Sequence, residues 1–404
     1  YTTRRCGMVP VPPRNSMDKT SLFTAAAVLT AILAGPAGTA APDASAPRPE
    51  PHSSLTLPGR WSPEKARTWD KTQPWLVGCN FTPSTAINQL EMWQAETFDA
   101  ETIDRELGWA AETGMNTVRV YLHDLLWQQD REGFLKRVDQ FLGIADGHGI
   151  RTMLVLCDAV WNPHPKLGKQ PEPKPHLHNS GWVQSPHIEV LRDPGKHDSL
   201  EPYFKGVIGR FKDDRRVLIW DLYNEPGNDG EQDKMTTAQK EEKCLLLLEK
   251  MFTWAREVAP TQPLTTGLWS NEWIGPDATA MNRFIRENSD VISFHTYDNI
   301  NRAAERVGSL KPYGRPLLCT EYLARGNGSR FEEHLPYFKK NKIGAYNWGW
   351  VAGKIQTQYP WASWRRKFTA EPKLWHHDVL KPDGSPHIPS EVELIKSLTA
   401  TKQK

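Results

Sequence analysis

Cysteine is scarce in this chain, with five residues among 404. Cys79, Cys157, Cys244 and Cys319 lie far apart, and none of their spacings is one that zinc ligands use. The pattern argues against a disulfide framework and excludes a cysteine-rich zinc site. Three of these residues lie in apolar, strand-like segments and Cys244 lies in a helical pattern, so we expect buried free thiols.

An excess of charge of one sign is also lacking. The 50 lysines and arginines nearly balance the 48 aspartates and glutamates. Residues 1–40 hold four basic residues and one acidic residue, which leaves 46 basic and 47 acidic residues in the rest of the chain. This balance predicts no binding to nucleic acid or to an anionic membrane surface.

Long apolar runs are limited to one, Leu22–Ala34. It follows a charged start at Met17, is too short to span a bilayer and precedes small residues, which is typical of a signal peptide over residues 17–40. Residues 1–16 are interpreted as an upstream leader or a mis-called start, and residues 41–60, rich in Ala, Pro and Ser, as a linker. We therefore expect a secreted or periplasmic protein with no membrane attachment after signal removal. A buried helix of a small N-terminal subdomain is the alternative.

What the chain does contain, from about residue 70, is an alternation of strand and helix patterns. Apolar segments predict strands over 75–80, 117–121, 151–157, 217–223, 264–266, 291–295, 316–320 and 343–348. Amphipathic patterns predict helices over 100–112, 133–148, 200–212, 237–258, 279–287, 301–310, 331–340 and 391–398. Eight such units predict one α/β domain, a (β/α)8 TIM barrel over residues 61–404. A doubly wound open sheet is the alternative, but no glycine-rich phosphate turn follows the first strand.

Two predicted connections are too long to be simple links. Residues 158–197 follow the third strand, and residues 349–389 follow the eighth. Both exceed the roughly 12–15 residues of an ordinary structureless loop. Because both leave the C-terminal ends of barrel strands, where barrel enzymes bind substrates, we interpret them as walls of a pocket.

Two glutamates stand at the ends of predicted strands. Glu225 ends the segment Trp-Asp-Leu-Tyr-Asn-Glu and precedes Pro226, and Glu321 ends the segment Pro-Leu-Leu-Cys-Thr-Glu. Strands four and seven lie on opposite sides of a barrel mouth, so the two carboxyl groups should face each other. Hydrolysis of a sugar acetal needs such a pair, one to protonate the leaving oxygen and one to capture the cationic centre.

Four further residues support this chemistry. Arg119, inside an apolar strand, needs a carboxylate partner when buried and would keep Glu321 ionised, although a purely structural ion pair is the alternative. His295 and Tyr297 can donate hydrogen bonds to the two carboxylates, unless His295 is an ordinary core histidine. Trp348, one of 17 tryptophans, can form the floor of a sugar site by stacking or can pack the end of the barrel.

The chain resembles glycoside hydrolase family 5, the cellulase/mannanase family of retaining barrels, over roughly residues 70–400. The resemblance rests on Arg119, Asn224-Glu225-Pro226, Phe294-His295 with Tyr297, Thr320-Glu321-Tyr322 and Trp348. It implies that Glu225 is the acid/base, Glu321 is the nucleophile and Asn224 binds the 2-hydroxyl of the sugar at the cleavage point. Where many family members have a histidine after the third strand, this chain has Asp158, for which we expect a contact to a sugar hydroxyl.

The segment 347–361, together with 375–378, resembles secreted family members labelled xylanases or β-mannosidases. Lys354 and Gln356, close in sequence to Trp348 and Trp350, favour a closed pocket for a terminal sugar and therefore exo-action. An endo-acting β-1,4-glycanase and a non-catalytic carbohydrate-binding barrel are the alternatives. The expected partner is a carbohydrate, and the expected state is a monomer.

Histidines in the two long connections are the remaining candidates for metal binding. They are His164, His176, His178, His187, His197, His376 and His377, with Asp378 beside the last. None of their spacings matches a known zinc pattern, so we expect solvated histidines, no metal and no cofactor. No nucleophile elbow centred on serine and no phosphate-binding loop is present.

Overall fold

The computed structural model describes residues 56–228, 233–270 and 272–400. The predicted leader, the predicted signal peptide and most of the predicted linker lie outside the described residues. Leu57 and Arg60, at the end of the predicted linker, bind helix α8 (Ala280–Asn288). The Leu57 amide donates to Asn288 Oδ1 at 2.8 Å, and Arg60 Nη2 donates to the Arg286 carbonyl at 3.0 Å.

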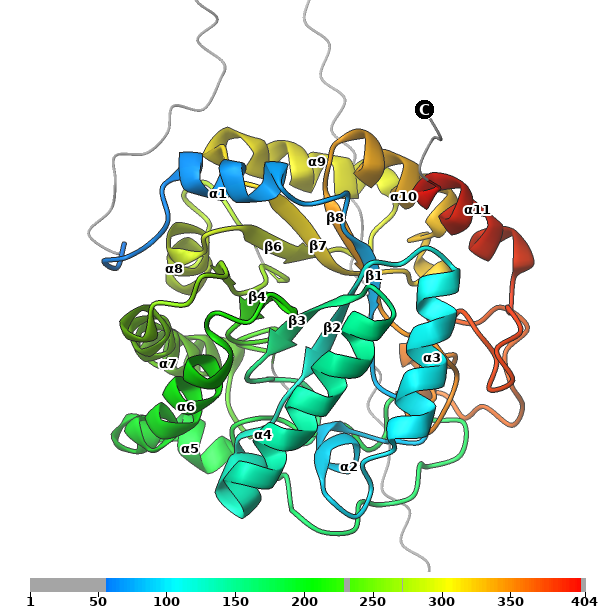
Figure 1. Ribbon diagram of the computed structural model, residues 1–404, viewed down its shortest axis with the longest axis horizontal. Helices are drawn as coiled ribbons and strands as arrows, with labels where there is room; N and C mark the ends of the chain where they lie inside the picture. Colours follow the sequence, from blue (N-terminus) through cyan, green and yellow to red (C-terminus); the bar gives the residue numbers. More distant parts are fainter. Residues whose placement is uncertain (1–55, 229–232, 271, 401–404) are drawn as a thin grey trace, which may run out of the picture. The chain divides into compact units, whose positions relative to one another are not determined.

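Eight parallel strands form the centre of the domain (Figure 1). They are β1 (Val77–Asn80), β2 (Thr117–Tyr121), β3 (Arg151–Val155), β4 (Val217–Asp221), β5 (Leu264–Thr265), β6 (Ile292–His295), β7 (Leu317–Tyr322) and β8 (Gly344–Asn347). The hydrogen-bonded order is β5-β4-β3-β2-β1-β8-β7-β6. Between β5 and β6, Leu268 forms a parallel bridge with Phe294 and accepts a hydrogen bond from the His295 amide at 2.8 Å. The predicted (β/α)8 barrel is thereby confirmed.

Helices surround the strands in Figure 1. They are α1 (Pro63–Lys71), α2 (Gln89–Trp93), α3 (Ala100–Glu112), α4 (Asp124–Gly147), α5 (Ile188–Arg192), α6 (Glu201–Phe211), α7 (Thr237–Val258), α8, α9 (Ile300–Leu310), α10 (Phe331–Lys340) and α11 (Pro389–Thr399). Short 3-10 turns are η1 (Pro194–Leu200), η3 (Lys311–Tyr313), η4 (Arg325–Asn327) and η5 (Trp361–Trp364). Helix α7 begins with a capping box, in which Thr236 Oγ1 accepts from the Gln239 amide and Gln239 Oε1 accepts from the Thr236 amide.

Helix α4 differs from the prediction, because it begins at Asp124 rather than Gly133. The chain is kinked at Asp130, which has non-helical φ and ψ of −156° and 77°. Asp130 Oδ1 accepts a hydrogen bond from the Gly133 amide at 2.9 Å, as the cap of a helix does. The helical pattern predicted from Gly133 is therefore the second part of a longer, kinked helix.

The strands align polar and apolar side chains in layers. Register pairs Arg119 with Met153 and Met153 with Ile219, so these three side chains lie on the same face of the sheet. Met153 and Ile219 belong to a small apolar cluster, separate from the main core between strands and helices.

The four cysteines of the described barrel are free and buried, as predicted.

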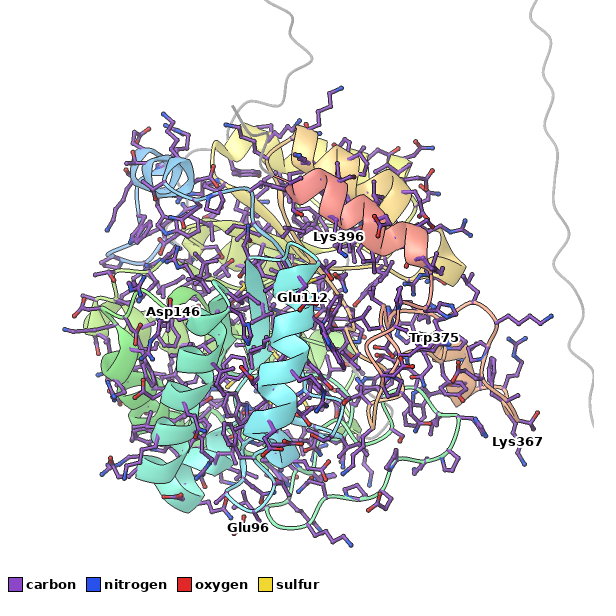
Figure 2. The ribbon with its side chains drawn as sticks, turned by 45° about the vertical axis from the view of Figure 1, so that its right-hand side comes forward. Glu96, Glu112, Asp146, Lys367, Trp375 and Lys396 are labelled. Atoms are coloured by element: carbon purple, nitrogen blue, oxygen red, sulfur yellow. The ribbon has the colours of Figure 1, made fainter. Side chains whose placement is uncertain are left out.

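The two long connections carry structure of their own. The connection from β3 to α6 contains α5 and η1, and the connection from β8 to α11 contains η5. In Figure 2 the labels Trp375 and Lys367 mark the second connection, which extends to one side of α3 and α11. Among the described residues, no helix has the length and apolar character needed to cross a membrane.

Candidate active site

Glu225 lies four residues beyond β4 and adopts φ of 43°, a left-handed conformation that is unusual for glutamate. Its Oε2 accepts a hydrogen bond from Asn228 Nδ2 at 2.7 Å, and its Oε1 lies 2.9 Å from His295 Nδ1. The side chain is largely buried, and this burial raises the pKa of Glu225 to about 7. Near neutral pH, this carboxyl group can therefore both hold and release a proton.

Glu321 lies within β7 in surroundings of a different kind. Its Oε1 accepts hydrogen bonds from Arg119 Nη1 at 2.9 Å and from the Tyr121 hydroxyl at 3.0 Å. Its Oε2 accepts from the Tyr297 hydroxyl at 2.7 Å. A guanidinium and two phenol donors stabilise the carboxylate anion. The predicted pairing of Arg119 with Glu321 is present in the structure.

His295 lies between the two glutamates. Its Nδ1 is 2.9 Å from Glu225 Oε1 and 3.5 Å from Glu321 Oε2. One oxygen of each carboxylate and one nitrogen of His295 all lie within 4.8 Å of one another. Burial lowers the pKa of His295 to about 4, so the ring is neutral. The structure thus brings together both predicted carboxylates and the histidine expected to orient them.

Arg119 connects Glu321 to a second carboxylate that sequence reasoning did not single out. Its Nε and Nη2 donate to Asp221 Oδ2 at 3.0 and 2.8 Å. It also donates to Asn80, to Asn224 and to Tyr121. Asp221 ends β4 within the same segment as Glu225, and Tyr121 is two residues beyond Arg119 on the same face of β2. Strand alternation could therefore have identified both.

Asp158 does not contact the pocket as expected. It is completely buried, and its Oδ1 accepts from Asn224 Nδ2 and from the Val160 amide, both at 3.0 Å. Its Oδ2 accepts from Gln89 Nε2 and Trp182 Nε1. Burial raises the pKa of Asp158 to about 7, yet all four partners are donors, which favours the ionised form. Asp158 thus fixes the Asn224 amide from behind, and the expectation of a sugar contact is corrected.

Lys354 is also placed differently from the expectation. Its ammonium group binds Glu91 Oε1 at 2.7 Å, and the side chain is absent from the lining of the pocket described below. Its backbone amide donates to the Ser84 carbonyl at 3.0 Å. Gln356 binds the other long connection, since its Oε1 accepts from the His176 amide at 3.0 Å. Both polar residues join connections instead of facing a ligand.

A pocket with a cavity volume of about 280 Å³ opens over the two glutamates. It is lined by Val160, Trp161, His178, Asn179, Asn224, Glu225, Asn228, Trp269, Tyr297, Glu321, Trp348, Trp361 and His377. Residues from both long connections contribute, so these connections are walls of the pocket, as predicted. Trp348 meets Tyr121 and Trp182 edge to face, with ring centroids 5.8 and 5.9 Å away, which holds its ring at the base of the pocket.

The expectation of solvated histidines is wrong for four of them. His178, His197, His376 and His377 are all buried, whereas His164 is exposed. Burial lowers the pKa of His178 to about 4 and of His376 to about 3. Sequence reasoning missed His178 and His377 as pocket residues, and their positions depend on contacts between distant loops. Among the described residues, the set with metal-ligand spacing is Glu225, His295 and Glu321.

Comparison with known proteins places this geometry in a family. The model of the cellulase family (glycosyl hydrolase family 5) matches residues 79–354. No curated protein matches the chain. Similar solved structures include the GH5_18 enzyme of Streptomyces cattleya in complex with Manβ1-4GlcNAc, with 14% identity, TM-score 0.55 and coverage of 81% of each chain.

Two further structures share the fold. The exo-β-1,4-mannosidase of Opitutaceae bacterium strain TAV5 has 18% identity and TM-score 0.54, with 80% of this chain and 59% of that chain covered. The β-1,4-mannanase of the sea hare Aplysia kurodai has 16% identity and TM-score 0.50, with 68% of this chain and 87% of that chain covered. From the family match over 276 residues and the barrel that carries it, the chain belongs to glycoside hydrolase family 5 and is a glycosidase.

Proposed function

We propose that this protein is a retaining, exo-acting β-glycosidase of the β-mannosidase type, which removes a terminal sugar from β-linked oligosaccharides. It acts as a secreted or periplasmic monomer and needs no cofactor. The observation that carries the proposal is the pair of unlike carboxyl groups in a pocket that is closed on one side. Glu321 is the nucleophile and Glu225 is the acid/base.

In the first step, a carboxylate oxygen of Glu321 attacks the anomeric carbon while the bond to the leaving oxygen breaks. Glu225 transfers its proton to that oxygen, and a glycosyl ester forms on Glu321. In the second step, Glu225 removes a proton from water, the water oxygen attacks the anomeric carbon, and the ester bond to Glu321 breaks. Asn224 donates to the 2-hydroxyl, and Trp348 stacks on the sugar ring.

The distance between the carboxyl groups supports retention of configuration. Retaining glycosidases have carboxyl groups about 5–5.5 Å apart, whereas inverting enzymes need about 6.5–9.5 Å to admit a water molecule. An oxygen of Glu225 and an oxygen of Glu321 lie within 4.8 Å of each other. This approach of the nearest oxygens fits the shorter separation of retaining enzymes.

Contacts among three connections support exo-action. The Lys354 amide bonds the Ser84 carbonyl at 3.0 Å, and the Asn179 amide bonds the Ile355 carbonyl at 2.8 Å. At Gly353 the chains approach so closely that an added Cβ would lie 2.3 Å from the Ser84 carbonyl oxygen. The connections after β1, β3 and β8 therefore seal one side of the barrel mouth. A glycan chain bound at the cleavage point could then extend in one direction, away from the sealed side.

The sugar is inferred from the comparisons. Two of the similar structures are described as an exo-β-1,4-mannosidase and as a complex with Manβ1-4GlcNAc, which carries a terminal β-1,4-linked mannose. Mannose at the cleavage point is therefore the first candidate. Glucose is the second, because a β-glucosidase also shares the fold, at 10% identity and TM-score 0.55.

The test is release from aryl β-mannoside, β-glucoside, β-xyloside and β-galactoside and from aryl α-L-arabinofuranoside. Glu321→Gln is assayed in parallel, with the exposed Glu305→Gln as the matched control. We expect rapid release of mannoside, lost only in Glu321→Gln, and NMR detection of the β-anomer as first product. Progressive release of single sugars from β-1,4-mannooligosaccharides is expected. A mixture of internal fragments would instead establish endo-action, and release by Glu321→Gln would refute the assignment of the nucleophile.

A further inference from the structure

His178 is a pocket residue whose position is fixed by the opposite wall. Its side chain lies in the connection after β3, yet its ring Nδ1 is 2.8 Å from the Tyr359 carbonyl. Its backbone amide donates to Ser363 Oγ at 3.0 Å, and its carbonyl accepts from Trp364 Nε1 at 2.9 Å. All three partners belong to the connection after β8. The imidazole is thus held in one orientation at the junction of the two walls.

The partner of Nδ1 determines the tautomer of His178. A carbonyl oxygen can only accept, so the ring proton is on Nδ1 and Nε2 carries a free lone pair. Burial lowers the pKa of His178 to about 4, so the ring stays neutral at the pH where Glu225 works. Among the described residues no group forms a hydrogen bond with Nε2, and His178 lines the pocket. This nitrogen can therefore accept a hydrogen bond from a ligand in the pocket.

The surroundings of His178 contain other acceptors that lack donors. His377 binds the Leu323 carbonyl through Nδ1, and its Nε2 is buried without a partner. Its ring centroid is 5.4 Å from that of His178 and 5.5 Å from that of Tyr297, which binds Glu321. Asn179 Oδ1 is buried without a partner as well, and all these residues line the pocket. This wall offers acceptors to a ligand that brings hydrogen-bond donors.

Two kinds of ligand could supply what the acceptors lack, a metal cation or a hydroxyl group. A metal would need ring nitrogens of His178, His376 and His377 grouped at ligand spacing. The one group with that spacing among the described residues is Glu225, His295 and Glu321. Hydroxyl groups of a sugar, by contrast, need one acceptor each and lie at the rim of a ring stacked on Trp348.

We propose that Nε2 of His178 accepts a hydrogen bond from one hydroxyl of the sugar at the cleavage point and thereby selects sugars with a hydroxyl at that position. The inference rests on the proposed function, because it assigns a specificity residue to the same pocket. His178 forms no bond with either glutamate. It acts on the choice of sugar and leaves the protonation of Glu225 unchanged.

The test combines enzyme variants with modified substrates. His178→Phe removes the acceptor and keeps a planar ring. His197→Phe is the matched control, because His197 is also buried, binds one backbone carbonyl (Leu191, 3.0 Å) and lies outside the pocket. The substrates are the preferred aryl glycoside and its analogues with each sugar hydroxyl replaced in turn by hydrogen or by fluorine. Fluorine cannot donate a hydrogen bond, so both replacements should have the same effect at the position that His178 binds.

For the wild type and His197→Phe, we expect kcat/KM to fall on the order of 10–100-fold at that position. For the parent substrate, kcat/KM of His178→Phe should be lower than that of the wild type by a similar factor. For the two analogues modified at that position, kcat/KM of His178→Phe should not fall further. If its sensitivity to every analogue equals that of the wild type, the inference is wrong. Inactivity of the wild type towards all parent glycosides would instead refute the proposed function. Thermal melting shows whether the variant folds, and His178→Leu replaces it if it does not.

Discussion

The ends of β4 and β7 each present one glutamate, but the two carboxyl groups have different neighbours. Glu225 is bonded to a neutral amide and a neutral imidazole, and burial raises its pKa to about 7. Glu321 is bonded to the Arg119 guanidinium and to two phenol hydroxyls. The two side chains are identical, but a full positive charge and two hydroxyl donors face Glu321, whereas burial dominates the surroundings of Glu225. This difference supports the role of proton donor for Glu225 and of nucleophile for Glu321, and a substitution at either residue tests it.

Removing the nucleophile should have the largest effect. In Glu321→Gln the amide cannot form the glycosyl ester, so we expect kcat to fall on the order of 10⁵-fold, whatever the leaving group. Steady-state hydrolysis of an aryl glycoside measures the loss. Glu305→Gln, which changes an exposed glutamate, should retain wild-type activity. An equal loss in both variants would point to misfolding, which thermal melting would reveal.

Glu225→Gln should have a smaller effect that depends on the leaving group. With an alkyl glycoside, which needs a proton, we expect a loss of about 10²–10⁴-fold. A dinitrophenyl leaving group departs as an anion, so formation of the ester should be nearly unaffected while its hydrolysis slows. Mass spectrometry should then detect one sugar unit attached to Glu321. If both leaving groups suffer the same loss, Glu225 is not the acid.

The raised pKa of Glu225 predicts the alkaline limb of the pH profile. The acid works only while protonated, so kcat/KM for an alkyl glycoside should be constant below about pH 7 and fall about tenfold per pH unit above it. With a dinitrophenyl leaving group, formation of the ester needs no proton, so its pH profile should lack this alkaline limb. Profiles for both substrates measure this directly. If the alkaline limb has the same midpoint with both substrates, it belongs to a group other than Glu225.

The sequence predicts only part of this difference between the two glutamates. The positions of Glu225 beyond β4, of Glu321 near the end of β7 and of Arg119 inside β2 could be predicted, because eight apolar segments define the barrel and the motifs mark where strands end. The direction of a side chain beyond a strand is less predictable. Asp158 lies three residues beyond β3, yet it turns behind Asn224 because donors from α2 and from its own connection surround it.

The walls of the pocket could not be predicted residue by residue. Their geometry depends on contacts between segments that are distant in the sequence. Lys354 binds Glu91, 263 residues away, and the His178 ring binds Tyr359, 181 residues away. No local periodicity reports such pairs. The lengths of the two connections predicted that walls exist, and only the three-dimensional contacts show which side chains face the pocket.

Asn228→Ala should have the smallest effect. It tests the difference between the two glutamates most directly, because it changes the pKa of Glu225 and leaves both catalytic groups in place. Asn228 Nδ2 donates to Glu225 Oε2 at 2.7 Å, and this bond stabilises the anion and lowers the pKa that burial raises. In Asn228→Ala the anion loses a donor, so the pKa of Glu225 should rise further. The alkaline limb should then move to higher pH by up to about one unit, with the plateau of kcat/KM within about threefold of wild type.

Profiles of kcat/KM against pH for an alkyl glycoside measure the shift. The double variant Glu225→Gln/Asn228→Ala serves as the control and should show no limb of this kind. A movement to lower pH would mean that Asn228 stabilises the protonated acid through its carbonyl oxygen. An unchanged midpoint would mean that a group other than Glu225 controls the limb, and the contrast between the two glutamates would then lose its functional meaning.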